Sequence, residues 1–195
     1  MRQIEQNYRS GRLRVIDTPV PAEREDRNLV ASRVSLISAG TEKQIIDLGK
    51  SNLAQKAMAR PDLVKKTLRK MQQEGIKQTV AKVFSKLDTP IPLGYSLAGR
   101  VVHGGARAGG LVPGDRVACA GAGVANHADY NSVPKHLTVR IPEGVSDEAA
   151  SFVTLGAIAL QGVRVAAPTL GERVVVMGLG LIGQLTVQLL KANGC

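Results

Sequence analysis

Residues 172–183 read Glu-Arg-Val-Val-Val-Met-Gly-Leu-Gly-Leu-Ile-Gly, and this stretch decides the fold of the C-terminal part of the chain. The run Val174–Val176 is typical of a buried parallel strand, because β-branched residues favour strands. It leads into Gly178–Gly183, which has the pattern G-x-G-x-x-G, and residues 184–192 continue with the apolar spacing of a helix. A strand, a glycine turn and a helix in this order predict a dinucleotide-binding unit.

The residues of this motif have separate physical roles. Gly178 permits the tight turn, Gly180 lets the backbone approach a pyrophosphate, and Gly183 lets the helix pack closely on the strand. The helix start adds free N–H groups for the phosphates, so Leu181 and Ile182 belong to the same expected site. The alternative is a purely structural turn, since glycine-rich turns between strands and helices are common.

Composition excludes several classes of protein. The chain has 195 residues, 44% of them hydrophobic, without a run of 18 apolar residues, so no membrane-spanning helix is expected. The N-terminus lacks the apolar core of a signal peptide, and two cysteines give no disulfide framework. We therefore expect a cytoplasmic protein. Without tryptophan and with 3% aromatic residues, the chain offers few stacking surfaces for single-stranded nucleic acid.

The net charge of +10 is concentrated in residues 43–88, which carry nine lysines and two arginines against four acidic residues. Apolar residues at helical spacing predict a basic helical hairpin within residues 61–88, preceded by a shorter helix over Leu53–Ala59. Three interpretations of this segment stay open: a solvated lysine face, a surface for an oligomer or a second module, and a surface for anionic substrates or nucleic acid. Nucleic acid is disfavoured, because the lysines surround both helices and no known binding motif accompanies them.

The rest of the first 145 residues alternates between strand patterns and glycine turns. An N-terminal hairpin is expected from Arg2–Tyr8 and Leu13–Ile16, and further strands from Leu29–Ile37, Leu97–Val102, the residues around Val117, and His136–Ile141. Ser146 is a candidate N-cap for a helix over about Asp147–Val165. Irregular antiparallel β structure followed by α/β structure predicts two domains, of which the second has barely begun.

Six stretches, taken in order, are more specific than any one motif: Ser38–Glu42, Gly94–Gly99, Val112–Val117, His127–Pro134, Ile141–Val145 and Gly178–Gly183. In this order they resemble the N-terminal part of the medium-chain dehydrogenase/reductase superfamily, the alcohol-dehydrogenase-like enzymes. The resemblance implies a mixed α and β fold. It implies a GroES-like β-barrel catalytic domain over residues 1–150, in which residues 43–90 are a helical insertion. Over residues 151–195 it implies a linker helix and the first βα unit of a truncated Rossmann domain that binds NAD or NADP.

The zinc chemistry of that superfamily does not carry over. Zinc-dependent members have a ligand cysteine where this chain has Ala39, and Gly-His-Glu where it has Gly94-Tyr95-Ser96. Ungapped counting back from the glycine turn puts the third ligand near Val153. Alanine and valine cannot bind zinc, so the resemblance implies a zinc-independent member. The Ser-Ala-Gly-Thr-Glu turn, the basic insertion and Thr154–Gly162 together look like the N-terminal part of bacterial bi-domain oxidoreductases.

Without zinc, side chains must hold the substrate oxygen and move a proton. The resemblance places Thr41 where the superfamily has a hydroxyl that relays the alcohol proton, and the alternative is a helix N-cap with Glu42 behind it. The Tyr95 phenol is either a donor to a carbonyl oxygen or a filler aromatic. By resemblance, Thr154 is expected near the nicotinamide. His127 has either a catalytic role or an ordinary place at a strand edge.

The leading hypothesis is the N-terminal part of a zinc-independent, NAD(P)-dependent oxidoreductase, which transfers a hydride to or from a carbonyl/alcohol substrate; the resemblance suggests a sugar-related one. The expected partners are a nicotinamide dinucleotide, a small-molecule substrate, and a second copy or a second oxidoreductase module; neither nucleic acid nor a membrane is expected. The alternative is a non-catalytic GroES-like docking or assembly fragment. It is motivated by the end of the chain at Cys195, before the ribose-selecting residue that lies about 20 residues beyond the glycines.

Overall fold

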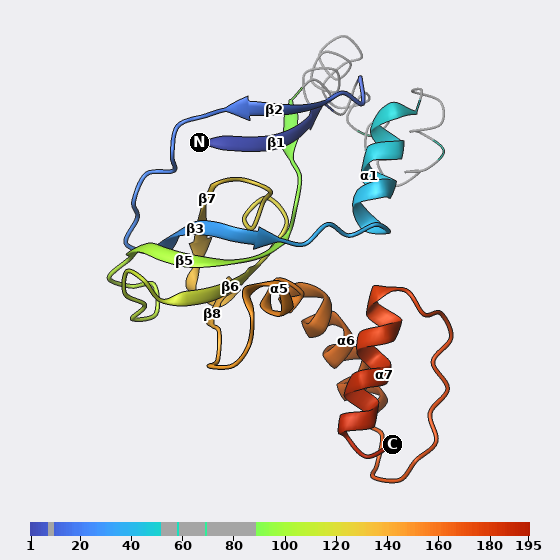
Figure 1. Ribbon diagram of the computed structural model, residues 1–195. Helices are drawn as coiled ribbons and strands as arrows, with labels where there is room; N and C mark the ends of the chain where they lie inside the picture. Colours follow the sequence, from blue (N-terminus) through green and yellow to red (C-terminus); the bar gives the residue numbers. More distant parts are fainter. Residues whose placement is uncertain (8–9, 52–57, 59–68, 70–88) are drawn as a thin grey trace. The chain divides into compact units, whose positions relative to one another are not determined.

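The computed structural model describes residues 1–7, 10–51, 58, 69 and 89–195. The basic helical hairpin and the short helix expected before it fall almost entirely outside these described residues. The chain divides into two compact units, which are coloured along the sequence in Figure 1. The first unit joins Met1–Pro19 to Ile37–Gly94, and the second joins Val20–Leu36 to Tyr95–Cys195.

The first unit contains a three-stranded sheet. Its central strand β1 (Arg2–Asn7) pairs antiparallel with β2 (Leu13–Asp17) on one side and with β4 (Pro90–Pro92) on the other. The predicted N-terminal hairpin is therefore confirmed. The sequence did not predict β4, because prolines at two of its three positions argue against a strand. They are tolerated here because β4 is an edge strand, where a missing N–H breaks no inner ladder.

A buried polar side chain attaches α1 (Thr41–Lys50) to the hairpin of the first unit. The Gln6 side chain is fully buried, and its amide donates to the carbonyl oxygens of Ile46 at 3.1 Å and Gly11 at 3.4 Å. A Cβ added to Gly49 would lie 2.3 Å from the Gln6 amide nitrogen. The helix therefore needs glycine at this position to pack against the buried amide.

The second unit is built on a five-stranded antiparallel sheet, whose order is β7-β3-β5-β6-β8. Its strands are β3 (Arg27–Ser35), β5 (Ser96–Gly104), β6 (Arg116–Ala120), β7 (Tyr130–Pro134) and β8 (Thr138–Arg140). Buried apolar residues of these strands and Ala125, which lies between β6 and β7, form one core: Val30, Leu97, Val101, Val117, Cys119, Ala125 and Val133. The strand expected over His136–Ile141 is shorter than predicted, because Lys135–Leu137 form a 3-10 turn, η1, before β8.

Two helices replace the single helix expected over Asp147–Val165: α5 (Asp147–Ala150) and α6 (Val153–Ala166). The predicted N-cap is confirmed, since the Ser146 hydroxyl accepts from the Ala149 N–H at 3.1 Å. The helix is interrupted at Ser151, whose hydroxyl donates to the Glu148 carbonyl at 2.7 Å. Serine side chains compete with the backbone in this way, so a break between the two helices has a local cause.

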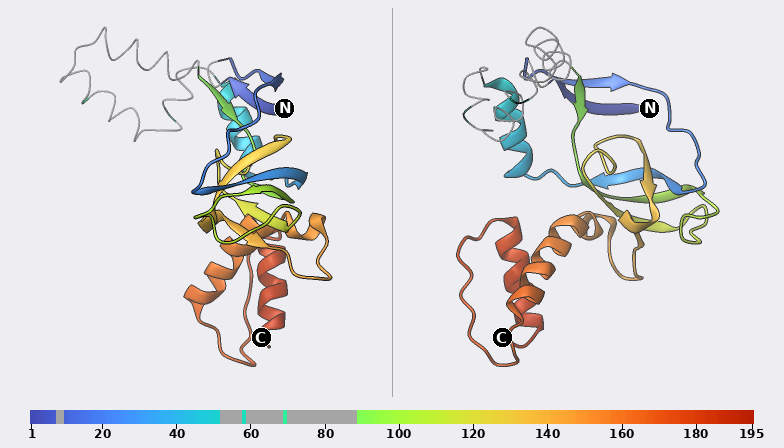
Figure 2. Two further views of the ribbon diagram at one scale, coloured as in Figure 1. Left: turned by 90° about the vertical axis from the view of Figure 1, so that its left-hand side faces the viewer. Right: turned by 180° about the vertical axis from the view of Figure 1, so that it is seen from behind.

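The helix α7 (Leu181–Ala192) lies beside α6 and runs in the same direction (Figures 1 and 2). Hydrogen bonds tie the C-terminal ends of the two helices together: Gly171 N–H donates to Gly194 O at 2.8 Å, and the Asn193 amide to Pro168 O at 3.3 Å. The starts of α6 and α7 therefore lie toward the opposite end of the pair. Among the described residues, no helix has the length and apolar character needed to cross a membrane.

The connection from α6 to α7 differs from the expectation. Val174–Val176 was predicted as a strand, but these residues form no ladder with any described strand. A strand is held by hydrogen bonds to its neighbour, and the described residues supply no neighbour for this one. Its side chains are correspondingly open, with Val175 87% and Met177 94% exposed.

Candidate functional site

The glycine turn enters α7 with the geometry that its three glycines were expected to give. Gly178 has φ +94°, in the left-handed region that side chains disfavour. A Cβ added to Gly183 would lie 1.9 Å from the Gly178 carbonyl oxygen, so only glycine lets the helix close on the turn. At Gly180, by contrast, a Cβ would meet no described atom within 4 Å, which leaves room for a ligand against the backbone.

The first turn of α7 also presents hydrogen-bond donors. Gly180 is the N-cap and provides no side-chain cap, and the first helical hydrogen bond runs from Gln184 N–H to Gly180 O at 2.9 Å. Within the described part of the chain, the N–H groups of Leu181, Ile182 and Gly183 have no acceptor. The 12-residue helix adds partial positive charge at this end. Space, donors and charge together fit the pyrophosphate of a dinucleotide.

Tyr95 and Thr154 are brought together by the structure. The Thr154 hydroxyl donates to the Tyr95 carbonyl oxygen at 3.0 Å, and the Gly121 N–H donates to the same oxygen at 2.9 Å. The Tyr95 phenol oxygen is buried and has no hydrogen-bond partner among the described residues. A buried hydroxyl without a partner costs about 1–3 kcal/mol, so this atom is one that a ligand oxygen would satisfy.

Ser96 is a residue that the sequence analysis did not single out for the site. Its side chain is fully buried, and its hydroxyl donates to Ser151 O at 2.6 Å and accepts from Thr154 N–H at 3.2 Å. The only signal in the sequence is its position directly after Tyr95. That signal is weak, because serines at the start of a strand are ordinary and the two partners lie more than 50 residues away in the chain.

Thr154 and the glycine turn lie toward the same end of the α6–α7 pair. Thr154 is in the first turn of α6, Gly178–Gly183 leads into α7, and the two helices are parallel with their C-terminal ends joined. Because Thr154 holds the Tyr95 carbonyl, the Tyr95 backbone belongs to this end as well. The expected cofactor residues of the second unit and the Tyr95 backbone therefore share one end of a helix pair.

Thr41 belongs to the first unit, where it is the first residue of α1 and has an exposed side chain. The capping role considered for it is filled by Ser38, whose hydroxyl accepts from Thr41 N–H at 3.4 Å. Glu42 in turn accepts from the Ser38 N–H at 3.1 Å, so the two side chains cap reciprocally, as in a capping box. The Thr41 hydroxyl is thus not needed to cap the helix, and its role in proton relay stays a prediction.

His127 links two elements of the second unit. Its Nδ1 atom lies 2.8 Å from the Ser35 hydroxyl at the end of β3. The catalytic role stays a prediction for this histidine. Ala39 and Val153, which the resemblance puts at two expected zinc-ligand positions, have no donor atom. Among the described residues, no cluster of three or more histidine, cysteine or acidic residues is placed to bind a metal.

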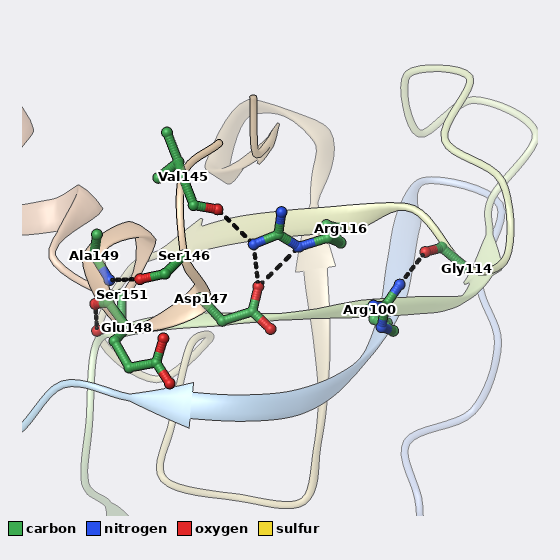
Figure 3. Close-up of polar contacts among 9 residues, drawn as sticks. All are labelled: Arg100, Gly114, Arg116, Val145, Ser146, Asp147, Glu148, Ala149 and Ser151. Carbon is green, nitrogen blue, oxygen red and sulfur yellow. Dashed lines mark hydrogen bonds and ion pairs between the residues drawn. The ribbon is translucent and has the colours of Figure 1, made fainter. Parts of the chain in front are cut away.

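An ion pair fastens the start of α5 to the sheet (Figure 3). The Arg116 guanidinium on β6 donates to one carboxylate oxygen of Asp147 at 2.7 and 3.0 Å and to the Val145 carbonyl at 2.6 Å. Arg100 on the neighbouring strand turns instead to the Gly114 carbonyl, at 3.1 Å (Figure 3). The Arg116 pair therefore joins the barrel sheet to the helices that lead to the glycine turn.

Replacing Asp147 by alanine is expected to lower the free energy of unfolding by about 1 kcal/mol, because a half-buried Arg116 loses its charged acceptor. The matched control is Glu148→Ala in the same helical turn, since the Glu148 carboxylate makes no contact with the residues drawn in Figure 3. Urea denaturation measures both variants. An equal loss of unfolding free energy in the two variants would show that the ion pair contributes nothing to stability. In that case only the negative charge in the first turn of the helix matters.

Cys119 is expected to be inert toward thiol reagents. Burial in β6 raises the pKa of its thiol from an ordinary 9.0 to about 12, and a hydrogen bond with Thr138 offsets part of that rise. A disulfide reagent at pH 8 should therefore modify one thiol, Cys195, and none in Cys195→Ser. The unfolded thiol ionises near pH 9 and the folded one near pH 12, so this contribution to stability is present below pH 9 and is lost as the pH rises toward 12. Rapid modification of two thiols in the folded chain would contradict this account.

Known proteins with similar sequences are dehydrogenases. Over 129 residues, 54% of this chain, it is 29% identical to (R,R)-butanediol dehydrogenase of Bacillus subtilis. Over 102 residues, 52% of this chain, it is 32% identical to D-guloside 3-dehydrogenase of Shigella flexneri. The matches span only 37% and 29% of those two relatives. No family model matches the chain.

Solved structures match over the whole chain. An alcohol dehydrogenase superfamily protein from Novosphingobium aromaticivorans has a TM-score of 0.72 at 20% identity, and this chain covers 51% of it. The quinone oxidoreductase of Thermus thermophilus, solved also in complex with NADPH, has a TM-score of 0.65 at 20% identity with the same 51% coverage. Identities this low show the fold alone.

The fold and the glycine turn define the class: a mixed α and β oxidoreductase fold with a dinucleotide-type turn. The chain is similar in sequence to dehydrogenases and in fold to an alcohol dehydrogenase superfamily protein. These similarities confirm the resemblance to the medium-chain dehydrogenase/reductase superfamily that the ordered motifs predicted.

Proposed function

We propose that this chain is the N-terminal part of a zinc-independent oxidoreductase that uses NAD or NADP to transfer a hydride to or from a carbonyl/alcohol substrate. The observation that carries the proposal is the glycine turn, in which Gly183 closes on Gly178 while Gly180 stays open and three amides of α7 lack acceptors among the described residues. The name of the relative D-guloside 3-dehydrogenase supports a sugar-related hydroxyl as the reacting group.

In this proposal the nicotinamide cofactor supplies the hydride chemistry. The chain binds the cofactor, orients the substrate and moves the proton. The amides of Leu181, Ile182 and Gly183 hold the pyrophosphate at the start of α7. The Tyr95 hydroxyl, which has no partner among the described residues, donates a hydrogen bond to the substrate oxygen and stabilises the negative charge that develops there during reduction. For Thr41 the proposed role is proton relay, which suits an exposed hydroxyl that is not used for capping.

Zinc independence is the part of the proposal that rests on side-chain chemistry. Ala39 and Val153 have no donor atom, and a tyrosine at the remaining ligand position is a poor zinc ligand. Elemental analysis of the purified protein should find less than stoichiometric zinc; one zinc per chain would overturn this part.

The two free thiols, Cys119 and Cys195, fit the reducing cytoplasm that we propose as the compartment.

We also keep the proposed division into a GroES-like domain over residues 1–150 and a Rossmann segment over residues 151–195. A second copy of the chain or a second oxidoreductase module is the proposed macromolecular partner. The exposed apolar residues between α6 and α7 are consistent with such a partner.

Titration with NADPH and NADH tests the proposal. The chain has no tryptophan, so the fluorescence of the bound reduced nicotinamide is recorded by direct excitation without interference from indole. We expect saturable binding that Gly180→Asp abolishes and Gly162→Ala preserves, since the first change puts a carboxylate where the pyrophosphate would lie. If neither this chain nor a longer gene product binds either nucleotide, the proposal fails and the docking fragment becomes the better hypothesis.

A further inference from the structure

We propose that Ser96 and Thr154 are positioning residues for Tyr95. Their hydroxyl groups pin the Tyr95–Ser96 peptide to the start of α6 and thereby hold the Tyr95 phenol in one orientation. The inference rests on the proposed function, since it concerns the group that would meet the substrate oxygen. It names two residues whose contribution comes through Tyr95 and not through contact with the reacting atoms.

The two hydroxyls form a reciprocal clamp between β5 and α6. Ser96 Oγ accepts from Thr154 N–H at 3.2 Å, and Thr154 Oγ1 donates to the Tyr95 carbonyl at 3.0 Å. Tyr95, directly before β5, and Ser96, its first residue, are thus bonded to the side chain and the main chain of one helical residue. The peptide between Tyr95 and Ser96 cannot rotate without breaking at least one of these bonds.

The clamp also completes the helix. The N-cap residue of α6, Phe152, makes no side-chain cap, so the first N–H groups of this helix need acceptors from elsewhere. Ser96 supplies one of them from a distant strand, and the same hydroxyl donates to the Ser151 carbonyl at 2.6 Å. Its donor and one of its acceptor sites are both used, so neither alanine nor valine can replace it.

Two further backbone contacts hold the Tyr95–Ser96 peptide and the peptide that follows it. The Tyr95 carbonyl also accepts from Gly121 N–H at 2.9 Å, and the Ser96 carbonyl accepts from Leu36 N–H at 2.9 Å. These hydrogen bonds hold the backbone at Tyr95. The Tyr95 side chain, by contrast, has a buried hydroxyl without a partner among the described residues. The Tyr95 carbonyl accepts two hydrogen bonds while its phenol oxygen has no partner among the described residues, as expected for a side chain held ready for a ligand.

Fluorine NMR of the chain labelled with 3-fluorotyrosine tests the clamp without any ligand. The sequence has three tyrosines, Tyr8, Tyr95 and Tyr130, and Tyr95→Phe assigns the signal of interest. We expect Thr154→Val to shift and broaden the Tyr95 signal at least twofold in linewidth and to leave Tyr130, in the same unit, unchanged. Thr154→Ser keeps the hydroxyl and should retain the wild-type signal. Ser96→Ala is the second variant and should reproduce the effect of Thr154→Val.

The matched control is Thr186→Val in α7, because the Thr186 hydroxyl only donates to Ile182 O of its own helix, at 2.8 Å. It should leave all three signals unchanged. An unchanged Tyr95 signal in both Thr154→Val and Ser96→Ala would overturn the proposal, as would equal changes at Tyr95 and Tyr130, which would indicate general loosening. Because these spectra need no nucleotide, a failure of NADPH binding would refute the proposed function and leave the test of the clamp intact.

Discussion

Replacing Gly183 by alanine is expected to destroy the nucleotide turn. The new Cβ would lie 1.9 Å from the Gly178 carbonyl oxygen and 3.0 Å from its carbon, both of which are backbone atoms. Backbone cannot move aside as a flexible side chain does, so the start of α7 must open. Overpacking of this kind costs about 1–3 kcal/mol, and the displaced amides should weaken NADPH binding by roughly tenfold or more.

Gly180→Ala is the informative comparison for Gly183→Ala, because its Cβ meets no described atom within 4 Å. Thermal unfolding followed by circular dichroism should show a loss of stability for Gly183→Ala alone, whereas nucleotide titration should show weakened binding for both. If Gly180→Ala binds NADPH like the wild type, the ligand does not approach the backbone at this glycine. If Gly183→Ala retains full stability, the close approach of the helix to the turn is not a constraint.

Gly99→Ala is expected to weaken the pairing of β3 with β5 strongly. Gly99 is a buried residue of β5, where a Cβ would lie 2.3 Å from the Ala31 carbonyl oxygen and 2.9 Å from a methyl group of Val30. Both neighbours belong to β3, which pairs with β5 along its length, so relief would require the central strands to separate. We expect a loss of about 3 kcal/mol and a decrease in melting temperature of roughly 6–12 °C.

Gly162→Ala provides the control for this prediction. Gly162 lies in α6, is exposed, and would place its Cβ in open space, so alanine should stabilise the helix by about 1 kcal/mol. Both variants are compared with the wild type by thermal and urea unfolding. A change of the same sign in the two would mean that chain entropy at glycine, and not the contact between β3 and β5, governs the result.

Features that depend on neighbours in the sequence were predicted well. The hairpin of β1 and β2, the Ser146 cap and the glycine turn all follow from residues a few positions apart, and the structure contains each of them. The turn at Asp115 is equally local, since its carboxylate accepts from the Val112 N–H at 2.8 Å. Turns and helix caps can be predicted from a sequence because the two residues that form each hydrogen bond are close along the chain.

Other features required contacts across the chain. The strand β4 exists because an edge of β1 accepts its prolines, whereas Val174–Val176 has ideal strand residues and no described neighbour with which to pair. The hydrogen bond between Ser96 and Thr154 joins residues 58 positions apart, and no periodic pattern in the sequence predicts it. Strand propensity alone therefore missed β4 and wrongly predicted a strand over Val174–Val176. A strand forms only where a neighbouring strand is available for pairing.

The sequence by itself determined the resemblance to the medium-chain dehydrogenase/reductase superfamily, the glycine turn, and the alanine and valine at two positions where that resemblance expects zinc ligands, because these depend on residue identity and spacing. Only the tertiary structure decided how the candidate site is held. It brought the Tyr95 carbonyl to Thr154, buried the phenol without a partner among the described residues, and placed Thr154 and the glycine turn at one end of two parallel helices. The physical reason is that hydrogen bonds between distant segments form when packing brings the segments together, and packing is a property of the whole fold.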